Sequence, residues 1–233
     1  MNAMVLAAGR GTRLAALGLG VPKPLIEIGG ETLLARQLRY LHGGGVQRVV
    51  VNAHHRSEAI EEFAAEYRSG GGGELIVVVE PELLGTAGGV RNALPQLGEE
   101  TFLVLYSDVL FDEPLGPLLA THHERGASAT LTVYESAQLS GKGVVEADSH
   151  GVVTGFIEKG EREPGERGLV NAGLYVIEPA LLAGLEPGVA ADFGHDVFPA
   201  ALARGERLAV HRLAAPVLDV GTPADLERAR LAV

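Results

Sequence analysis

Glycine, arginine and lysine residues near the amino terminus have the types and spacing of a polyphosphate site. Gly9, Gly11 and Arg13 lie in a loop after a short apolar run, and Lys23 follows ten residues later between two prolines. Glycines let a ligand approach the main chain, and free backbone N–H groups after a strand bind anions. Arginine and lysine side chains add positive charge. This stretch therefore predicts that the protein binds a polyphosphate.

The loop differs from two common phosphate-binding motifs. It is not G-x-x-x-x-G-K-[ST], because no Lys-Ser/Thr pair follows the second glycine. It is not G-x-G-x-x-G, because Leu14 occupies the position of the third glycine. An ordinary strand-to-helix turn with cations at the surface is the alternative interpretation of the same residues.

An aspartate at the end of a later apolar run has the chemistry of a magnesium ligand. Asp108 follows the segment TFLVLYS, which is typical of a buried strand. Mg²⁺ prefers one or two carboxylates together with phosphate oxygens and waters. A carboxylate beside a polyphosphate site fits that preference, and a turn-capping role is the alternative. The D-x-D pattern of glycosyltransferases is absent at Asp108.

The elements that must position these residues alternate along the first half of the chain. Apolar runs predict strands over 4–8, 46–52, 75–79 and 101–106, and helical spacing predicts helices over 31–41 and 57–67, with Ser57 as N-cap. Strand–helix alternation is typical of a Rossmann-like, three-layer, doubly wound and mostly parallel α/β sheet. Ligands collect at the carboxyl ends of such strands.

The second half has short strands without long helices between them, which predicts antiparallel additions to the sheet. A helix is expected over 115–125, with His122 and His123 at its surface. Thr222 and Pro223 have the types expected at the start of the last helix. Further strands are predicted over 127–135, 143–146, 152–158, 169–177 and 208–213, with a helix-containing segment over 192–204.

Composition excludes several classes of protein. The chain has 233 residues, a formal charge of -11 and no cysteine. The length fits one domain with a full core. Clustered basic residues for nucleic acid are lacking, thiol chemistry and disulfides are excluded, and no apolar run approaches the length of a membrane span. No signal peptide opens the chain, so a cytoplasmic location is expected.

Several motifs, taken in order, resemble those of the sugar-1-phosphate nucleotidyltransferases, also called nucleoside-diphosphate-sugar pyrophosphorylases. The motifs are L-A-A-G-x-G-T-R-L, P-K-P-L, L-G-T-A-G, F-x-E-K, N-A-G-x-Y and D-x-G-T-P. The pattern is closest to the mannose or manno-heptose-1-phosphate guanylyltransferase branch. One departure is Ala15 to Leu17, where many members have R-P-L-T. The resemblance implies a GT-A-like nucleotidyltransferase fold, Mg²⁺ as cofactor, and NTP and sugar-1-phosphate as substrates, and it allows a homodimer.

The resemblance assigns roles to residues of this chain. Arg13, Lys23 and Asp108 are expected to be catalytic, and Asp108 and Asp219 are expected to bind the metal. The expected nucleotide-binding residues are Leu6, Ala7, Ala8, Gly9, Gly11, Thr12, Arg13, Lys23, Glu80, Gly85, Thr86, Ala87 and Asp108. The expected sugar-phosphate-binding residues are Gly143, Glu158, Lys159, Asn171 and Asp219. His195 and Asp196 either line the acceptor pocket or cap their own helix, and His54 and His55 are read as loop or cleft-edge residues.

Glu80 bears on the choice of nucleotide. It precedes Gly85 by five positions, where relatives that transfer uridylyl or thymidylyl groups commonly have glutamine. A carboxylate only accepts hydrogen bonds, so it suits guanine, which offers donors at N1 and at the exocyclic N2. GTP is therefore favoured over UTP, CTP and ATP. The alternative is that Glu80 turns away or caps the following loop.

The expected activity is nucleotidyl transfer from GTP to a mannose- or manno-heptose-type 1-phosphate. A UTP- or CTP-dependent enzyme acting on another phosphate, such as N-acetylmuramic acid 1-phosphate, is one alternative. An inactive relative that senses nucleotide-sugars is another. The chain is expected to form a single nucleotidyltransferase domain over 1–233, with a nucleotide-binding half at 1–110 and a sugar-phosphate-binding half at 111–233.

Overall fold

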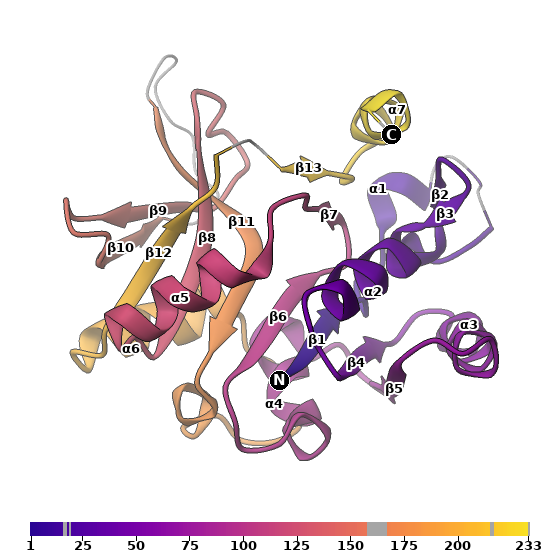
Figure 1. The fold of residues 1–233 in the computed structure, drawn as a ribbon, viewed down its shortest axis with the longest axis horizontal. Helices are drawn as coiled ribbons and strands as arrows, with labels where there is room; N and C mark the ends of the chain where they lie inside the picture. The colour runs from indigo at the N-terminus through magenta and orange to yellow at the C-terminus, as the bar shows by residue number, and fades with distance from the viewer. Residues whose placement is uncertain (16–17, 19, 158–166, 215–216, 233) are drawn as a thin grey trace.

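A computed structural model of the chain describes residues 1–233 except 16–17, 19, 158–166, 215–216 and 233. Its centre is a nine-stranded sheet (Figure 1). The strands are β1 (Asn2–Leu6), β4 (Arg48–Ala53), β5 (Glu74–Val79), β6 (Phe102–Tyr106), β8 (Ala129–Ser136), β9 (Val144–Ala147), β10 (Val153–Ile157), β11 (Gly168–Ile177) and β12 (Leu208–Arg212).

The pairing of the strands confirms a parallel first half with antiparallel additions. The order β6-β1-β4-β5 is parallel throughout. The long strand β11 runs antiparallel to β6 and β9 on one edge and to β8 on the other, and β12 is parallel to β8. β11 therefore joins the parallel part of the sheet to the antiparallel part.

Helices cover both faces of the sheet, as the strand–helix alternation predicts. Along β1, Ala3 and Val5 pack in a cluster with α2, α3 and α5, whereas Met4 packs with α4 and α6 on the opposite face. The helices are α1 (Thr12–Ala15), α2 (Leu33–Gly43), α3 (Ser57–Ser69), α4 (Gly85–Leu97), α5 (Leu115–Arg125), α6 (Phe198–Ala203) and α7 (Pro223–Ala232), with 3-10 turns η1 (Lys23–Leu25) and η2 (Pro179–Leu182) and a π-helix η3 (Phe193–Val197).

The last helix packs against the elements that follow the glycine loop. A small apolar cluster joins Leu14 of α1 and Ile28 of β2 (Glu27–Ile28) to Leu226 of α7. Figure 1 shows α7 next to α1 and to the hairpin of β2 and β3 (Glu31–Thr32). Thr222 caps α7 through its hydroxyl, as predicted, with a distance of 3.2 Å from Oγ1 to the backbone nitrogen of Asp225. The segment just before α7 is thereby placed close to Arg13.

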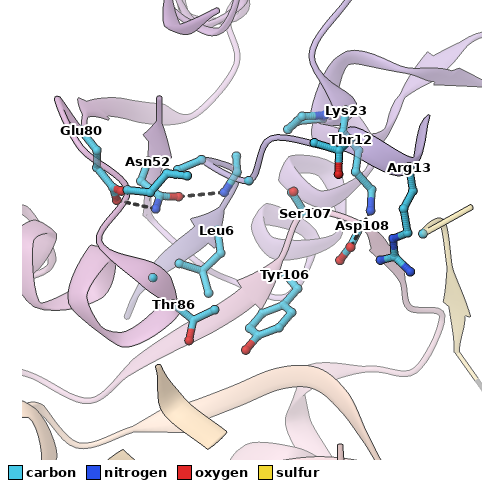
Figure 2. A pocket seen from close by; sticks show the side chains of 18 of the residues that line it. Leu6, Thr12, Arg13, Lys23, Asn52, Glu80, Thr86, Tyr106, Ser107 and Asp108 are labelled. Carbon is cyan, nitrogen blue, oxygen red and sulfur yellow. Dashed lines mark hydrogen bonds and ion pairs between the residues drawn. The ribbon is translucent and has the colours of Figure 1, made fainter. Parts of the chain in front are cut away.

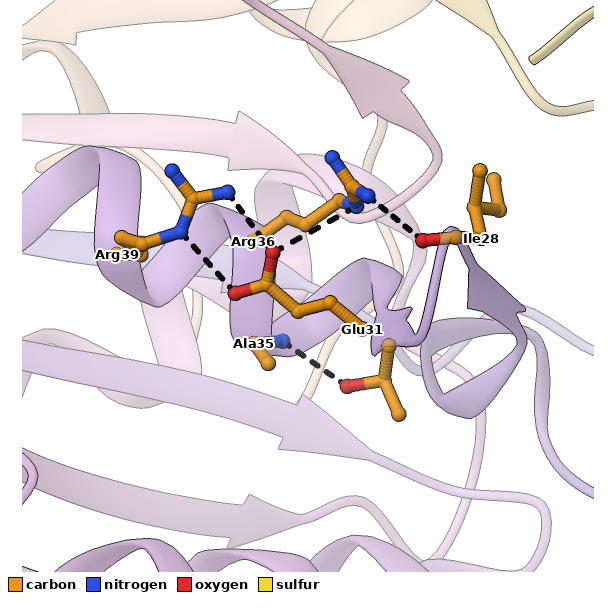
Figure 3. A network of polar contacts seen from close by, with 6 residues as sticks. Ile28, Glu31, Ala35, Arg36 and Arg39 are labelled. Atoms are coloured by element: carbon orange, nitrogen blue, oxygen red, sulfur yellow. Dashed lines mark hydrogen bonds and ion pairs between the residues drawn. The ribbon is translucent and has the colours of Figure 1, made fainter. Parts of the chain in front are cut away.

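A polar network holds the β2–β3 hairpin against α2 (Figure 3). Arg39 donates from Nε and Nη2 to the two carboxylate oxygens of Glu31, at 3.1 and 2.8 Å, and Nε of Arg36 lies 3.7 Å from Oε2 of Glu31. Arg36 donates to the carbonyl of Ile28 at 2.6 Å, and Thr32 caps the start of α2 with its side chain. The hydrogen bond from Arg39 holds the pKa of Glu31 below its ordinary value. This network fixes the hairpin that follows Lys23.

Two local predictions are wrong. Ser57 is the first residue of α3 rather than its N-cap, because Arg56 occupies the cap with a left-handed φ of 57° and no side-chain bond. His122 is buried rather than exposed. Its ring bonds the hydroxyl of Thr130 at 2.9 Å and Glu178 at 3.0 Å, so α5 packs its histidine against β8 instead of presenting it to solvent.

In the described part of the chain, every helix is too short or too polar to cross a membrane.

Candidate functional site

Two cavities lie at the carboxyl edge of the parallel strands. The first has a volume of about 420 Å³ and is bordered by the glycine loop and by the start of α4. The second has a volume of about 450 Å³ and is bordered by β11 and by the turn between β8 and β9. Residues that line both cavities are Arg13, Thr86, Tyr106, Asp108 and Asp192. A group bound in one cavity can therefore reach a group bound in the other.

Most of the predicted site residues line one of these cavities. Ala87, a residue of α4, does not line a cavity, because it is fully buried in the core. Glu158 and Lys159 lie outside the described residues. The first cavity is lined by Leu6, Ala7, Ala8, Gly9, Gly11, Thr12, Arg13, Lys23, Glu80, Gly85, Thr86 and Asp108. The second is lined by Gly143, Asn171, Asp219 and His195.

The glycine loop packs closely against the side chain of Lys23. Gly11 has a φ of +59°, and a Cβ atom there would lie 3.2 Å from the Cβ of Lys23. Pro22 is extended and starts the 3-10 turn that carries Lys23. The ammonium of Lys23 lies 2.6 Å from Oδ2 of Asp108, and both side chains are partly buried. The predicted cation and carboxylate thus meet directly at the end of β6.

Asp219 is brought to Asp108 by a short strand pair. β7 (Val109–Leu110) pairs with β13 (Leu218–Asp219), and the backbone nitrogen of Val220 donates to the carbonyl of Asp108 at 2.8 Å. Burial raises the pKa of the Asp219 carboxyl above its ordinary value, and the nearby charge of Asp108 raises it further. Lys23 and Arg13 oppose this effect. A buried carboxyl whose charged form is disfavoured by burial and by a neighbouring carboxylate is a favourable ligand for a divalent cation.

The donor set fits Mg²⁺ that shares its coordination with a substrate. Among the residues that the structure describes, no group of three or more His, Cys, Asp or Glu side chains could hold a metal. Asp108 and Asp219 would therefore supply two carboxylates and leave the remaining positions to phosphate oxygens and water. That is the arrangement Mg²⁺ prefers at nucleotide sites.

A buried chain of hydrogen bonds connects the start of the glycine loop to Glu80. The side chain of Asn52, at the end of β4, accepts from the backbone of Ala7 and donates to Oε1 of Glu80, both at 2.7 Å (Figure 2). Oε2 of Glu80 accepts from the backbone of Leu84 at 3.2 Å. Glu80 is 2% exposed. The carboxylate therefore supports the following loop, as one alternative anticipated, while it also borders the first cavity.

The first cavity has two chemically different ends. Figure 2 shows Glu80 and Asn52 at one end, and Lys23, Asp108 and Arg13 together at the other. One end offers hydrogen-bond acceptors and an amide, whereas the other concentrates two cations and a carboxylate. This polarity matches a ligand with a hydrogen-bonding ring at one end and an anionic tail at the other.

The glycines at the start of α4 allow a close approach of another part of the chain. Cβ atoms at Gly85 and Gly88 would lie 2.5 Å from the carbonyl oxygen of Ala191 and 2.6 Å from that of Val189. The backbone nitrogens of Ala87 and Gly88 both donate to the carbonyl of Ala191, at 2.9 and 3.0 Å. Gly85 was predicted to contact the nucleotide, and the structure adds that Gly85 and Gly88 dock the segment before η3.

Thr86 and Asp192 link the two cavities at this docking point. The hydroxyl of Thr86 donates to Oδ2 of Asp192 at 2.7 Å and accepts from the backbone of Phe193 at 2.9 Å. Asp192 also caps η3 by accepting from the backbone of Gly194 at 2.9 Å. A π-helix is rare and is often found at functional sites, and this one carries His195 into the lining of the second cavity.

The floor of the second cavity is a set of polar side chains on β6 and β11. Asn171 donates to the hydroxyl of Tyr175 at 2.5 Å and accepts from the backbone of Gly173 at 3.0 Å. The hydroxyl of Tyr175 lies 3.4 Å from that of Tyr106. Burial, together with the neighbouring Tyr175, raises the pKa of Tyr106 well above its ordinary value. Tyr106 therefore stays neutral and offers a hydroxyl to both cavities.

Several polar side chains that border the cavities were not among the predicted site residues. They include those of Asn52, Tyr106, Lys142 and Asp192. Tyr106 and Asn52 end buried strands, so their position at the carboxyl edge could have indicated a role. Asp192 offered no local signal, because its partner Thr86 is 106 residues away. His54, which was interpreted as a loop or cleft-edge residue, forms a hydrogen bond between its Nδ1 and the carbonyl of Glu80 at 2.8 Å.

Comparison with known proteins places the whole chain in one family. The model described as Nucleotidyl transferase matches residues 2–233. The mannose-1-phosphate guanylyltransferase catalytic subunit beta of Drosophila pseudoobscura pseudoobscura is 34% identical over 226 residues, covering 96% of this chain and 60% of that protein. The mannose-1-phosphate guanylyltransferase of Mycobacterium tuberculosis is 32% identical over 231 residues, covering 98% and 63%. The chain spans about six tenths of the length of these two relatives.

A solved structure confirms the fold class. The crystal structure of HddC from Yersinia pseudotuberculosis complexed with GMP-PN superposes with a TM-score of 0.83 at 22% sequence identity. The match covers 99% of this chain and 98% of that one. The nine-stranded sheet and its helical layers are therefore a fold that this chain shares with that protein.

Proposed function

Because the chain belongs to the nucleotidyl transferase family, we propose that it transfers a nucleotidyl group from an NTP to a sugar-1-phosphate and releases pyrophosphate. GTP is the favoured donor, and a mannose- or manno-heptose-type 1-phosphate is the favoured acceptor. The observation that carries the proposal is the pair of cavities that meet at Arg13 and Asp108. The nucleotide would occupy the first cavity and the acceptor the second, with the reacting phosphates at the shared residues.

The chemistry asks the protein to position phosphates and to neutralise their charge. An oxygen of the acceptor phosphate would attack the α-phosphorus of the NTP, and the bond from that phosphorus to pyrophosphate would break. Arg13 and the backbone of the glycine loop would hold the leaving pyrophosphate. Lys23, now 2.6 Å from Asp108, would stabilise charge at the α-phosphate. Effects of this kind, positioning and preorganised charge, supply most of the acceleration in phosphoryl transfer.

We propose Mg²⁺ as the cofactor, with Asp108 and Asp219 as its protein ligands. The raised pKa of Asp219, caused by burial and then by Asp108, supports a site built for a cation. When bound, Mg²⁺ would neutralise charge on the phosphates of both substrates. Lys159, outside the described residues, remains the proposed partner of the acceptor phosphate.

The preference for GTP rests on Glu80. A carboxylate has about four acceptor positions, and Glu80 uses two of them for Asn52 and Leu84. The remaining positions suit the two neighbouring donors of guanine. The names of the two relatives, both mannose-1-phosphate guanylyltransferases, support the same nucleotide and a manno-configured acceptor.

Replacing Glu80 by glutamine should weaken the preference for GTP. The amide puts a donor where the carboxylate offers acceptors, so the ratio of kcat/KM for GTP over UTP should fall about tenfold, equivalent to ~1.4 kcal/mol. The amide keeps only one acceptor oxygen, so either the side chain of Asn52 or the backbone N–H of Leu84 would lose its acceptor, and the melting temperature should drop by a few degrees. Both are measured on purified protein with each NTP in turn.

Glu82→Gln is the matched control, because Glu82 is exposed in the same loop and lines neither cavity. It should leave both the nucleotide ratio and the melting temperature unchanged. If Glu80→Gln lowers the melting temperature but keeps the GTP-to-UTP ratio of the wild type, Glu80 only supports the loop.

The experiment that tests the proposal is Mg²⁺-dependent release of pyrophosphate across a grid of substrates. Four NTPs would be combined with mannose, glucose, N-acetylmuramic acid and manno-heptose 1-phosphates. Release with GTP and a manno-configured acceptor is the expected result. Release with UTP or CTP alone would keep the class of enzyme and refute the choice of nucleotide. Binding of NTPs without release of pyrophosphate in the presence of any acceptor would favour a nucleotide-sugar sensor.

A cytoplasmic location and a homodimer complete the proposal. The chain contains no cysteine, so its stability does not depend on an oxidising compartment. Sedimentation of the purified protein would test the dimer.

A further inference from the structure

Lys142 is a cation of the second cavity that the proposed reaction does not use. It lies in the turn between β8 and β9, where its backbone nitrogen donates to the carbonyl of Leu139 at 3.1 Å and Gly141 has a φ of +72°. Its ammonium donates to the hydroxyl of Tyr134 at 2.9 Å and lies 5.3 Å from the centre of that ring. The turn and the tyrosine together hold the ammonium at the cavity wall.

Among the residues that the structure describes, no carboxylate lies within ion-pair distance of the Lys142 ammonium, although the chain has 30 acidic residues against 19 lysines and arginines. Lys23 differs in this respect, because it is paired with Asp108. Within the described ranges, the ammonium of this half-buried side chain donates only to the phenol of Tyr134, so two of its three donors are available for a ligand. We therefore expect the ammonium of Lys142 to bind an anionic group of the molecule that occupies the second cavity.

The position of Lys142 separates that anion from the reacting phosphate. Tyr134, which holds the ammonium, is on β8, whereas Asp108 follows β6. β11 lies between these two strands, and two strand spacings amount to about 10 Å. One phosphate group cannot span that distance. A sugar-1-phosphate whose reacting phosphate lies near Asp108 would extend its sugar toward Lys142.

We propose that Lys142 selects an acceptor that carries a second anionic group, a carboxylate or a phosphate, at the end of the sugar remote from the reacting phosphate. The inference rests on the proposed function, because it specifies the class of acceptor for the same cavity. Lys142 acts in it as a specificity determinant: it forms a charge-assisted hydrogen bond with the substrate and takes no part in the transfer of the nucleotidyl group.

The test compares acceptors that differ in the second anion. Mannose 1-phosphate, mannose 1,6-bisphosphate and mannuronic acid 1-phosphate would be assayed with GTP for kcat/KM, on the wild type and on Lys142→Met and Lys142→Arg. The wild type should prefer at least one of the two acceptors that carry a second anionic group, and which one it prefers distinguishes phosphate from carboxylate. In Lys142→Met that preference over mannose 1-phosphate should fall about 10- to 100-fold, and Lys142→Arg should restore most of it.

Arg204→Met is the control for a loss of charge, because Arg204 is at the exposed end of α6 and lines neither cavity. It should leave the preference unchanged. A wild type that favours mannose 1-phosphate over both mannose 1,6-bisphosphate and mannuronic acid 1-phosphate would overturn the inference. An equal loss for all three acceptors in Lys142→Met would also overturn it, because Lys142 would then serve the shared phosphate or the fold.

A binding experiment separates this inference from the proposed function. Calorimetric titration without NTP would measure the affinity of each protein for mannose 1,6-bisphosphate and for mannose 1-phosphate. If mannose 1,6-bisphosphate binds more tightly than mannose 1-phosphate, and Lys142→Met loses this difference, the result supports the anion site. This holds even if pyrophosphate is not released from GTP with any acceptor in the assay. Absence of turnover with every acceptor refutes the proposed function, whereas equal affinities for the two sugars refute the anion site.

Discussion

Replacing Asp108 by asparagine should lower turnover about a thousandfold. Asp108 lines both cavities, pairs with Lys23 at 2.6 Å and is linked to Asp219 through β7 and β13. An amide keeps the shape but loses the negative charge that a divalent cation needs. Metal-based stabilisation of phosphate charge is worth several kcal/mol, and a thousandfold loss corresponds to ~4 kcal/mol. The measurement is kcat for pyrophosphate release at saturating Mg²⁺.

Asp112→Asn is the matched control for this change. Asp112 lies four residues further along, is exposed and lines neither cavity, so its amide variant should keep the turnover of the wild type. Calorimetric Mg²⁺ titration in the presence of GTP should show binding that weakens in Asp108→Asn and stays normal in Asp112→Asn. Turnover of Asp108→Asn within threefold of the wild type would remove Asp108 from the metal site.

Replacing Lys23 by methionine should lower kcat about 10²- to 10³-fold, the size expected when one preorganised charge is lost from a transition state. Methionine retains most of the apolar stem, which packs against Gly11, so the loop should keep its shape. Because the proposed role is to stabilise charge that develops during the reaction, kcat should fall more than KM rises. Steady-state kinetics with varied GTP provide both parameters.

Two further variants sharpen the interpretation of Lys23. Arg10→Met removes a cation from the same loop, and Arg10 is exposed and lines neither cavity, so its kcat should change less than threefold. Lys23→Arg should recover only part of the activity, because a planar fork replaces a compact charge. A Lys23→Met variant in which KM rises and kcat is unchanged would make Lys23 a binding residue alone.

The sequence predicted those parts of the fold that follow from local patterns. Apolar runs such as 101–106 marked buried strands, and their alternation with helical segments indicated a doubly wound sheet, which the structure and the comparison with HddC confirm. Element ends differ by a few residues: α2, expected over 31–41, is Leu33–Gly43. Ends depend on caps and tertiary contacts, which the apolar pattern does not contain.

The contacts between distant segments were the parts that the sequence could not supply. His122 was assigned to the surface because a cation is favoured near the C-terminal end of a helix. Its partners are Thr130 of β8 and Glu178, the residue after β11. The glycines at the start of α4 were recognised, but the approach of Ala191 was not. Such contacts depend on how the elements pack, and a single sequence carries no record of that.

The site was predicted as far as its motifs extend. Arg13, Lys23 and Asp108 lie in recognisable patterns, and the structure places all three around the first cavity. Lys142 lies in the turn Gly141-Lys142-Gly143, which resembles the family's glycine turn, but that motif assigns a role to the backbone alone. The role of its side chain depends on Tyr134 and on the absence of an acidic partner in the described part of the chain. Single charged side chains in turns are common at protein surfaces, so only the folded structure distinguishes this one.

A phosphorus-31 NMR spectrum of the protein with GTP, mannose 1-phosphate and Mg²⁺ would detect nucleotidyl transfer directly. The signals of GTP and of the sugar phosphate should decline together. Two coupled resonances of a sugar–nucleotide diphosphate should replace them, with one equivalent of pyrophosphate. Removal of Mg²⁺ with a chelator should stop the change. GDP with orthophosphate, or signals that stay constant while GTP binds, would contradict nucleotidyl transfer to this acceptor.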